Sequence, residues 1–168
     1  REPSLSTAVE KSRSSSQPAH RTELSIVLPT YKEKDNVAEL IRRLGSALTG
    51  IEWEAIFVDD NSPDGTGQIA DVLAGGIARV HVLHRAQKEG LGRAYLAGFA
   101  WGIQRGYDML FEMDADFSHP IDALPGFYAA MARHDLVLGS RYIDGITVVN
   151  WPMKRLLISW FGNWYARK

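Results

Sequence analysis

The feature that most constrains the fold is an alternation of short apolar runs with stretches of helical spacing. The apolar runs are predicted strands, at residues 24–28, 55–58, 79–83, 109–113 and 136–138. Between them, apolar residues recur at steps of three and four, which is the period of one helix face. Short strands that alternate with amphipathic helices predict an α/β fold, with a mainly parallel sheet covered by helices on both faces.

The first two helices are predicted from their apolar faces. The first face is formed by Val37, Leu40, Ile41, Leu44 and Leu48. Asp35 or Asn36 precedes it and is the predicted N-cap. The second helix follows a predicted turn at residues 62–65 and carries Ile69, Val72 and Leu73 on one face.

Two further helices are predicted later in the chain. One covers residues 91–104, where Gly98 and Gly102 would let it lie close to the sheet, and the other covers about residues 121–132. The segment 90–95 (GLGRAY) does not fit the dinucleotide-binding glycine pattern, because Tyr95 stands where Gly or Ala is expected and the segment follows the third strand. Its glycines are therefore predicted to open a helix.

Composition limits what the chain can bind. Hydrophobic residues make up 45% and charged residues 23%, the profile of a globular domain, and the formal net charge is −1. We expect no bulk attraction to nucleic acid, so any affinity for phosphate must come from individual Arg and Lys side chains. The absence of cysteine excludes disulfides and thiolate metal sites, and fits a reducing compartment.

The two ends of the chain differ from the middle. Residues 1–22 are rich in Ser and charge, so we predict a disordered tail, followed by one domain over residues 23–168. No apolar run approaches the roughly 18 residues of a transmembrane helix, and we expect no signal peptide. Aromatic and basic residues mix in the last 18 positions, among them Trp151, Trp160 and Trp164. This mixture fits a helix at a membrane interface, or a core helix whose partner is absent.

Polar residues follow four of the predicted strands. They are Pro29-Thr30-Tyr31-Lys32-Glu33, Asp59-Asp60-Asn61, Asp114-Ala115-Asp116 and Gly139-Ser140-Arg141. In parallel sheets ligands bind at the carboxyl ends of the strands, where these residues would meet. Carboxylates and a guanidinium at four strand ends predict one shared site.

The triplet Asp114-Ala115-Asp116 predicts a metal site. Two carboxylates two residues apart after a strand can converge, and carboxylate and phosphate oxygens are the ligands that Mg²⁺ or Mn²⁺ prefers. Such a metal would bridge a diphosphate and offset the charge that develops on it as a leaving group. The alternative is that the triplet only ends a strand before a turn at His119-Pro120.

The remaining candidates also have two interpretations. A carboxylate of Asp59-Asp60 can accept hydrogen bonds from a base or ribose, or can form the turn that follows, and we expect both. Asp64 is better explained by turn chemistry. Arg141 and Arg155 can hold phosphate oxygens bidentately, although an isolated Arg is more commonly a solvated surface side chain.

Five segments occur in a familiar order. They are Leu28-Pro29-Thr30-Tyr31-Lys32-Glu33, Val58-Asp59-Asp60-Asn61-Ser62-Pro63-Asp64-Gly65-Thr66, Met113-Asp114-Ala115-Asp116-Phe117-Ser118-His119-Pro120, Gly139-Ser140-Arg141-Tyr142 and Asn150-Trp151-Pro152. From about Glu23 onward the chain thereby resembles the dolichol (polyprenol) phosphate mannose synthases of glycosyltransferase family 2. The Asn-Trp-Pro segment followed by Arg155 carries the likeness to the mannose synthase branch.

The resemblance implies a GT-A (Rossmann-like) fold, GDP-mannose as donor and a dolichyl or polyprenyl phosphate as acceptor. It implies inverting transfer at the cytoplasmic face of a membrane, with peripheral membrane contact. Because the acceptor phosphate is already largely ionised at neutral pH, we assign no general base. The implied nucleotide contacts are Pro29, Tyr31, Glu33, Val58 and Asp60. The implied metal and phosphate residues are Asp114 and Asp116 for Mg²⁺ or Mn²⁺, Ala115 through its backbone, Ser118 in place of a Gln of some relatives, and Arg141 and Arg155.

Two alternatives stay open. The same fold can use another donor, such as UDP-glucose, because nothing in these residues distinguishes guanine from uracil directly. Members of the family also continue past the position of Lys168 into a segment that helps to grip acceptor and donor. We therefore expect a domain that is incomplete at its C-terminus, or a non-catalytic module that binds nucleotide.

Overall fold

The computed structural model describes residues 24–139, and the chain divides into two compact units, Arg1–Tyr128 and Ala129–Lys168. The sheet and the candidate site belong to the first unit. Its elements alternate strictly: β1 (Leu24–Thr30), α1 (Val37–Ala47), β2 (Trp53–Asp59), α2 (Thr66–Gly76), β3 (Val80–His84), α3 (Leu91–Arg105) and β4 (Met109–Glu112). A short 3₁₀ helix η1 (Ile121–Ala123) and the helix α4 (Leu124–Met131) follow.

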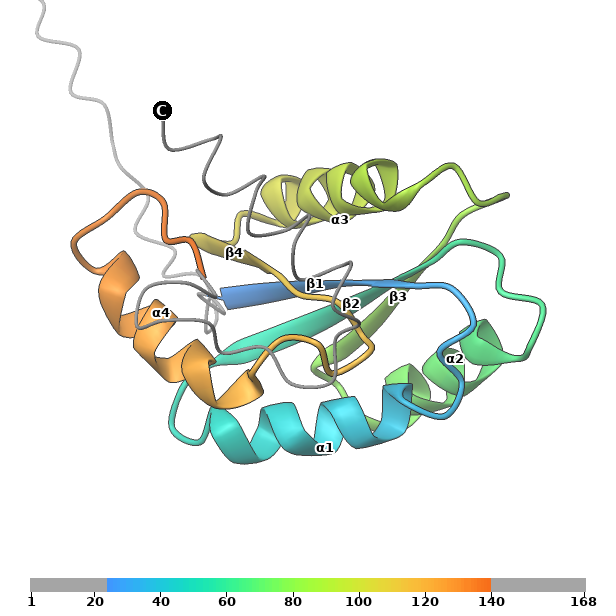
Figure 1. The fold of residues 1–168 in the computed structure, drawn as a ribbon, viewed down its shortest axis with the longest axis horizontal. Helices are drawn as coiled ribbons and strands as arrows, with labels where there is room; N and C mark the ends of the chain where they lie inside the picture. Colours follow the sequence, from blue (N-terminus) through green and yellow to red (C-terminus); the bar gives the residue numbers. More distant parts are fainter. Residues whose placement is uncertain (1–23, 140–168) are drawn as a thin grey trace, which may run out of the picture. The chain divides into compact units, whose positions relative to one another are not determined.

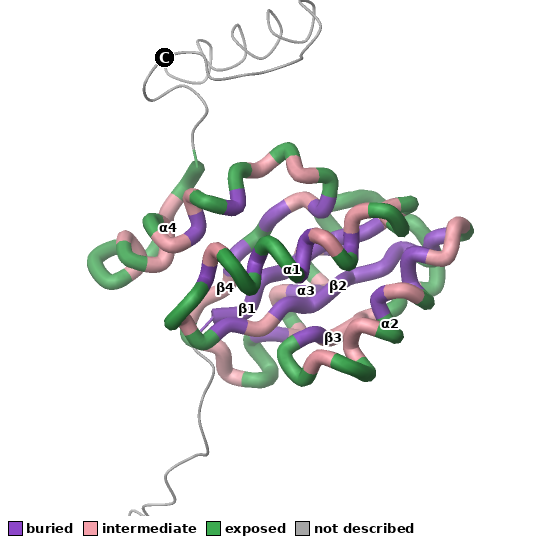
Figure 2. Tube along the Cα trace, turned by 90° about the horizontal axis from the view of Figure 1, so that it is seen from below, coloured by how far each residue is buried: buried purple, intermediate pink, exposed green. Residues whose placement is uncertain are grey.

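The four strands form one parallel sheet in the order β3-β2-β1-β4. The pairing of β1 with β2 runs from Leu24 opposite Trp53 to Thr30 opposite Asp59. Every residue of the central strand β1 is buried, which explains why five of its seven residues are apolar (Figure 2). Because all strands run in the same direction, the segments after β1, β2 and β4 leave the sheet at one edge.

Helices cover both faces of the sheet, with α3 on one face and α1 and α2 on the other (Figure 1). The closeness of α3 depends on two glycines. A Cβ atom on Gly98 would lie 2.2 Å from Cγ1 of Val27, and one on Gly102 would lie 2.5 Å from Cδ2 of Leu110. The expectation that these glycines let the helix lie close to the sheet is confirmed.

Four of the five predicted strands are confirmed, and so are all four predicted helices. The strand predicted at residues 136–138 is wrong, because no strand forms there and both Leu136 and Leu138 are exposed. None of the described strands pairs with this segment. A strand needs a neighbour for its backbone hydrogen bonds, and an apolar run alone does not provide one.

Two helix details also differ from the predictions. Asn36 is the N-cap residue of α1, but its side chain makes no capping bond and donates a 2.6 Å hydrogen bond to Oε2 of Glu33 instead. Of the apolar face predicted for α2, Val72 is 76% exposed, and Ile69 and Leu73 are only partly buried. The buried residues of α2 are Thr66, Gly67 and Ala70, whose small size lets the helix approach the sheet.

Within residues 24–139, no helix has the length and apolar character to cross a membrane. The predicted tail at residues 1–22 and the aromatic segment 151–168 lie outside the described residues.

Candidate functional site

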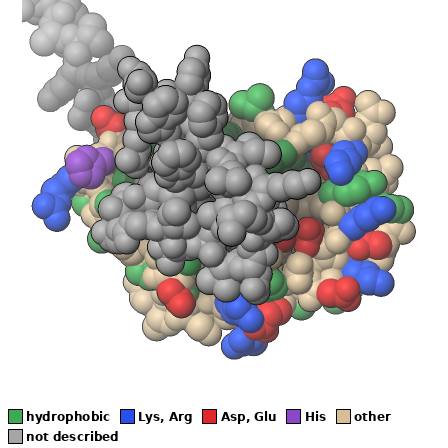
Figure 3. Space-filling model, viewed as in Figure 1, with side chains coloured by type: hydrophobic (Ala, Val, Ile, Leu, Met, Phe, Trp, Pro, Cys, Tyr) green, Lys and Arg blue, Asp and Glu red, His purple; other side chains and the backbone are tan. Residues whose placement is uncertain are grey.

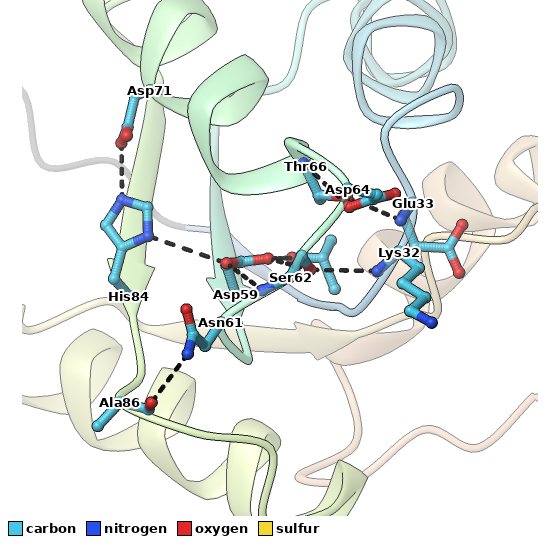
Figure 4. Close-up of polar contacts among 11 residues, drawn as sticks. Lys32, Glu33, Asp59, Asn61, Ser62, Asp64, Thr66, Asp71, His84 and Ala86 are labelled. Carbon is cyan, nitrogen blue, oxygen red and sulfur yellow. Dashed lines mark hydrogen bonds and ion pairs between the residues drawn. The ribbon is translucent and has the colours of Figure 1, made fainter.

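The loop after β1 is tied to the segment after β2 by two hydrogen bonds from backbone amides to side-chain hydroxyls (Figure 4). The amide of Lys32 donates to Oγ of Ser62 at 3.1 Å, and the amide of Glu33 donates to Oγ1 of Thr66 at 2.9 Å. Lys32 has a φ of 64°, a left-handed conformation that the two bonds on either side of it hold in place. The two strand-end loops therefore form one rigid wall.

Asp59 is the buried anchor of this wall. Its carboxylate accepts hydrogen bonds from the amide and hydroxyl of Ser62, at 3.1 and 2.6 Å, and from the hydroxyl of Thr30 at 3.5 Å. Asp64 accepts hydrogen bonds from the amide and hydroxyl of Thr66, which confirms its turn role. The two expected roles of Asp59-Asp60 are thus divided, with Asp59 holding the turn and Asp60 on the cavity wall.

The Asp114-Ala115-Asp116 loop is held from two directions. Tyr95 of α3 donates a 2.8 Å hydrogen bond to Oδ1 of Asp114, and the amide of Asp114 donates to Nδ1 of His119 at 3.1 Å. Oδ1 of Asp116 accepts the amide of Ser118 at 2.9 Å. Burial raises the pKa of Asp116, but the hydrogen bonds from Ser118 outweigh it, so this pKa lies below its usual value.

A cavity of about 220 Å³ lies where these loops meet. It brings together residues from the ends of β1, β2 and β4 and from the start of α3. Its walls are Pro29, Thr30, Tyr31, Glu33, Asp60, Lys88, Leu91, Ala94, Asp114, Ala115 and Asp116.

Seven of the predicted site residues line this cavity, namely Pro29, Tyr31, Glu33, Asp60, Asp114, Ala115 and Asp116. Val58 does not line it, because its side chain is fully buried in the core. Ser118 does not line it either, and reaches the site only through its hydrogen bond to Asp116. Arg141 and Arg155 lie outside the described residues.

Several residues near the cavity were not predicted from the sequence. Lys88 lines it, with Nζ 3.8 Å from the centroid of the Tyr31 ring. Arg85 pairs with Asp60 at 2.6 Å, and Tyr95 holds Asp114. The rule that points to the carboxyl ends of strands applies equally to the end of β3, and would have led to Arg85 and Lys88.

The two carboxylates of the triplet fit a hard divalent cation only in part. Within residues 24–139, no group of three or more His, Cys, Asp or Glu residues could hold a metal ion. Asp114 and Asp116 would supply two of the oxygen ligands that Mg²⁺ or Mn²⁺ prefers, and a diphosphate and water would have to supply the others. This donor set fits a metal that is bound together with a nucleotide.

A second and larger cavity, of about 370 Å³, lies between α1 and residues 117–122. Two arginines line it, Arg42 and Arg43, but both are paired with the Glu39 carboxylate. It contains one carboxylate, Asp122, and none of the predicted site residues. The smaller cavity is therefore the candidate site.

Comparison with known proteins agrees with this geometry. The model of the family described as Glycosyl transferase family 2 matches residues 25–168. The undecaprenyl-phosphate mannosyltransferase of Micrococcus luteus is 50% identical over 141 residues, which are 84% of this chain and 57% of that protein. The polyprenol monophosphomannose synthase of Mycolicibacterium smegmatis is 48% identical over 153 residues, covering 90% of this chain and 56% of that protein. The chain thus spans little more than half the length of these relatives.

Solved structures show the same architecture. S. aureus TarS in complex with UDP superposes with a TM-score of 0.53 at 23% sequence identity, covering 67% of this chain and 32% of that chain. This likeness confirms the predicted GT-A type of α/β fold. Since the family model matches most of the chain, including the whole candidate site, the chain belongs to glycosyltransferase family 2.

Proposed function

We propose that this chain is the donor-binding part of an enzyme that transfers mannose from GDP-mannose to a dolichyl or polyprenyl phosphate. The observation that carries the proposal is the cavity in which Asp114 and Asp116 meet Tyr31 and Asp60. Support for the sugar and the lipid comes from the relatives that are 48–50% identical. One is an undecaprenyl-phosphate mannosyltransferase and the other a polyprenol monophosphomannose synthase.

The charge of the cavity supports a metal-bound diphosphate. Four carboxylates and one ammonium group line it: Glu33, Asp60, Asp114, Asp116 and Lys88. Elsewhere, the basic and acidic side chains visible in Figure 3 are interspersed, so no broad positive surface on that view would attract a nucleotide. Mg²⁺ or Mn²⁺ at Asp114 and Asp116 would offset the excess negative charge, hold the donor diphosphate and stabilise the departing GDP.

The remaining wall of the cavity suits the nucleoside. Asp60 is 5% exposed, and its Oδ1 accepts a hydrogen bond from Arg85. No group in residues 24–139 donates to Oδ2, which can therefore accept from a base or ribose. Tyr31 also lines the cavity, and its ring provides a flat apolar surface there. Nζ of Lys88 lies over this ring. Leu91 and Ala94 at the start of α3 would exclude water from the opposite side.

The transfer itself needs no general base. A polyprenyl phosphate monoester is largely ionised at neutral pH, since its second pKa is about 6. Its oxygen can form a bond to the anomeric carbon as the bond to GDP breaks, which inverts the configuration at that carbon. Catalysis would come from positioning and charge stabilisation. Arg141 and Arg155 are the proposed phosphate clamps, and Ser118 supports the metal site through Asp116.

The hydrocarbon chain of such an acceptor lies in a bilayer, so we place the enzyme at the cytoplasmic face of a membrane, in peripheral contact with it. Co-sedimentation with vesicles that contain polyprenyl phosphate tests this. Equal binding to vesicles with and without the lipid phosphate would argue against acceptor recognition by this chain.

The experiment that tests the donor site is calorimetric titration of the chain with GDP-mannose, first with Mn²⁺ and then with EDTA. We expect binding that EDTA abolishes, no comparable binding of UDP-glucose, and loss of binding in Asp116→Ala. Asp122→Ala is the matched control, because Asp122 lies in η1, directly after this loop, and lines the other cavity. Tight binding of UDP-glucose alone would identify another donor, and metal-dependent binding without any transfer in the longer protein would identify a non-catalytic module.

A further inference from the structure

Tyr95 connects α3 to the first carboxylate of the triplet. Its hydroxyl donates a 2.8 Å hydrogen bond to Oδ1 of Asp114, and its ring stacks on Phe99 with centroids 6.2 Å apart. The usual pKa of a phenol is about 10, so the hydroxyl carries its proton at neutral pH and can donate it to Asp114. Tyr95 is therefore a permanent donor to one oxygen of Asp114.

The other oxygen of Asp114 is differently placed. The backbone amide of Asp114 donates to Nδ1 of His119 at 3.1 Å, so Nδ1 is an acceptor and the proton of the neutral ring lies on Nε2. This Nε2 is 3.9 Å from Oδ2 of Asp114, which is beyond hydrogen-bonding distance. The backbone amide and Oδ1 of Asp114 are thus both held by hydrogen bonds. Among residues 24–139 no hydrogen bond reaches Oδ2, which can bind a ligand in the cavity that Asp114 lines.

We propose that Tyr95 is a positioning residue that makes Asp114 bind the divalent cation through Oδ2 alone, and so favours Mg²⁺ or Mn²⁺ over Ca²⁺. This inference rests on the metal site of the proposed function. Small cations such as Mg²⁺ require near-octahedral coordination by single oxygens, whereas Ca²⁺ accepts more ligands and commonly binds both oxygens of a carboxylate. A carboxylate with Oδ1 held by a hydroxyl suits the first arrangement better than the second.

The packing of α3 explains how a helix residue reaches a loop. Gly98 lies one turn after Tyr95 and, because it has no side chain, lets the helix backbone lie against Val27 of β1. With the helix this close, the Tyr95 side chain can extend to the segment after β4. The hydroxyl position is therefore set by the sheet and helix together, which is the rigidity that a metal-positioning group requires.

The test is Tyr95→Phe, which removes the hydroxyl and keeps the ring. GDP binding is titrated against Mn²⁺ and, separately, against Ca²⁺. We expect the apparent Mn²⁺ affinity to fall about 10- to 100-fold, as for other residues that orient metal ligands. The Ca²⁺ affinity should fall less or rise, so that the Mn²⁺/Ca²⁺ preference decreases. Tyr107→Phe is the matched control: its hydroxyl also donates to a carboxylate, that of Glu54, away from the cavity, and it should leave both affinities unchanged.

The outcomes separate this inference from the proposed function. The inference is overturned if Tyr95→Phe has the same Mn²⁺/Ca²⁺ preference as the unaltered chain. This holds whether the two affinities are unchanged or both fall by the same factor. If Asp116→Ala still loses metal-dependent GDP binding in that case, the proposed metal site stands. If the unaltered chain binds GDP equally with Mn²⁺ and with EDTA, the metal site and the role of Tyr95 both fall.

Discussion

The guanidinium of Arg85 donates a 2.6 Å hydrogen bond from Nη1 to Oδ1 of Asp60, and its Nη2 reaches Oε2 of Glu89 at the same distance. Arg85 follows β3 and Asp60 follows β2, so the pair joins the ends of neighbouring strands beside the candidate site. The two side chains are only 12% and 7% exposed. An unpaired charge at such a place would be costly, so Asp60 depends on Arg85 for its position on the cavity wall.

Replacing Arg85 by Ala should therefore destabilise the fold and weaken nucleotide binding together. We expect the free energy of unfolding to decrease by about 3–5 kcal/mol, the usual cost of removing one partner of a buried ion pair. Urea denaturation measures the loss. Arg93→Ala is the control, because Nη1 of Arg93 lies 3.6 Å from Oε2 of the same Glu89 but the Arg93 side chain is 70% exposed. The urea midpoint of this variant should stay near that of the unaltered chain. Equal midpoints for the two variants would show that Asp60 does not need Arg85.

The close approach of α3 leads to a second prediction. Gly98→Ala would place a Cβ 2.2 Å from Cγ1 of Val27, and the strain should lower the free energy of unfolding by about 1–3 kcal/mol. It should also move Tyr95 away from Asp114 and weaken metal-dependent GDP binding. Gly92→Ala on the same helix meets no atom within 4 Å and should stabilise the chain by about 0.5–1 kcal/mol. Thermal and urea unfolding of both variants test this, and a Gly98→Ala midpoint at or above that of Gly92→Ala would contradict it.

The strands were predictable because burial leaves a simple mark on the sequence. All seven residues of β1 are buried, and a parallel strand covered on both faces reads as a continuous apolar run. An apolar run also led to the wrong prediction of a strand at residues 136–138, because such a run does not show whether a neighbouring strand is present to pair with it. Val72 misled in a similar way, since helical periodicity alone does not show that α2 packs through Gly67 and Ala70.

The candidate site was predictable where it follows directly from a strand end. Asp60, Asp114 and Asp116 come immediately after predicted strands, and the topology of a parallel sheet brings them together. Tyr95 and Lys88 were not predictable in this way. Tyr95 reaches Asp114 from a helix that lies close to the sheet, and the position of Lys88 over the Tyr31 ring depends on the path of the loop after β3.

Lys88 gives a third prediction. Its Nζ lies 3.8 Å from the Tyr31 ring centroid, and among the described residues it is the one Lys or Arg that lines the cavity. Nζ of Lys32 lies 5.6 Å from the same centroid, and Lys32 does not line the cavity. Lys88→Ala should weaken GDP binding about 2- to 5-fold, because it removes a positive charge that would pair with the GDP phosphates, and an exposed ion pair contributes up to about 1 kcal/mol. Lys32→Ala should change it less. Calorimetric titration of both variants compares them, and a larger effect of Lys32→Ala would show that the Lys88 contact does not serve the site.

Glu39 on α1 gives a prediction about pH. Its carboxylate accepts two hydrogen bonds of 2.7 Å from Arg42 and one of 2.8 Å from Arg43. These bonds, the one from Arg42 first, lower the pKa of Glu39 from 4.5 to about 2. A carboxyl group whose pKa is lower in the folded than in the unfolded chain stabilises the fold above its unfolded pKa. This contribution should therefore be complete above pH 4.5 and disappear as the pH falls toward 2.

Arg42→Ala should raise the pKa of Glu39 more than Arg43→Ala does, because Arg42 supplies two of the three hydrogen bonds and Arg43 supplies one. The pKa is measured from the carboxyl carbon of Glu39 by NMR between pH 2 and 6. Both arginines are more than half exposed, so 1 M salt should move the pKa of the unaltered chain upward, in the same direction as the substitutions. A Glu39 that titrates near 4.5 in the unaltered chain at low salt would show that the arginines are solvated and leave the carboxylate unpaired. In that case Arg42 and Arg43 would be free to bind an anion in the larger cavity, and added phosphate should then shift the resonances of both guanidinium groups.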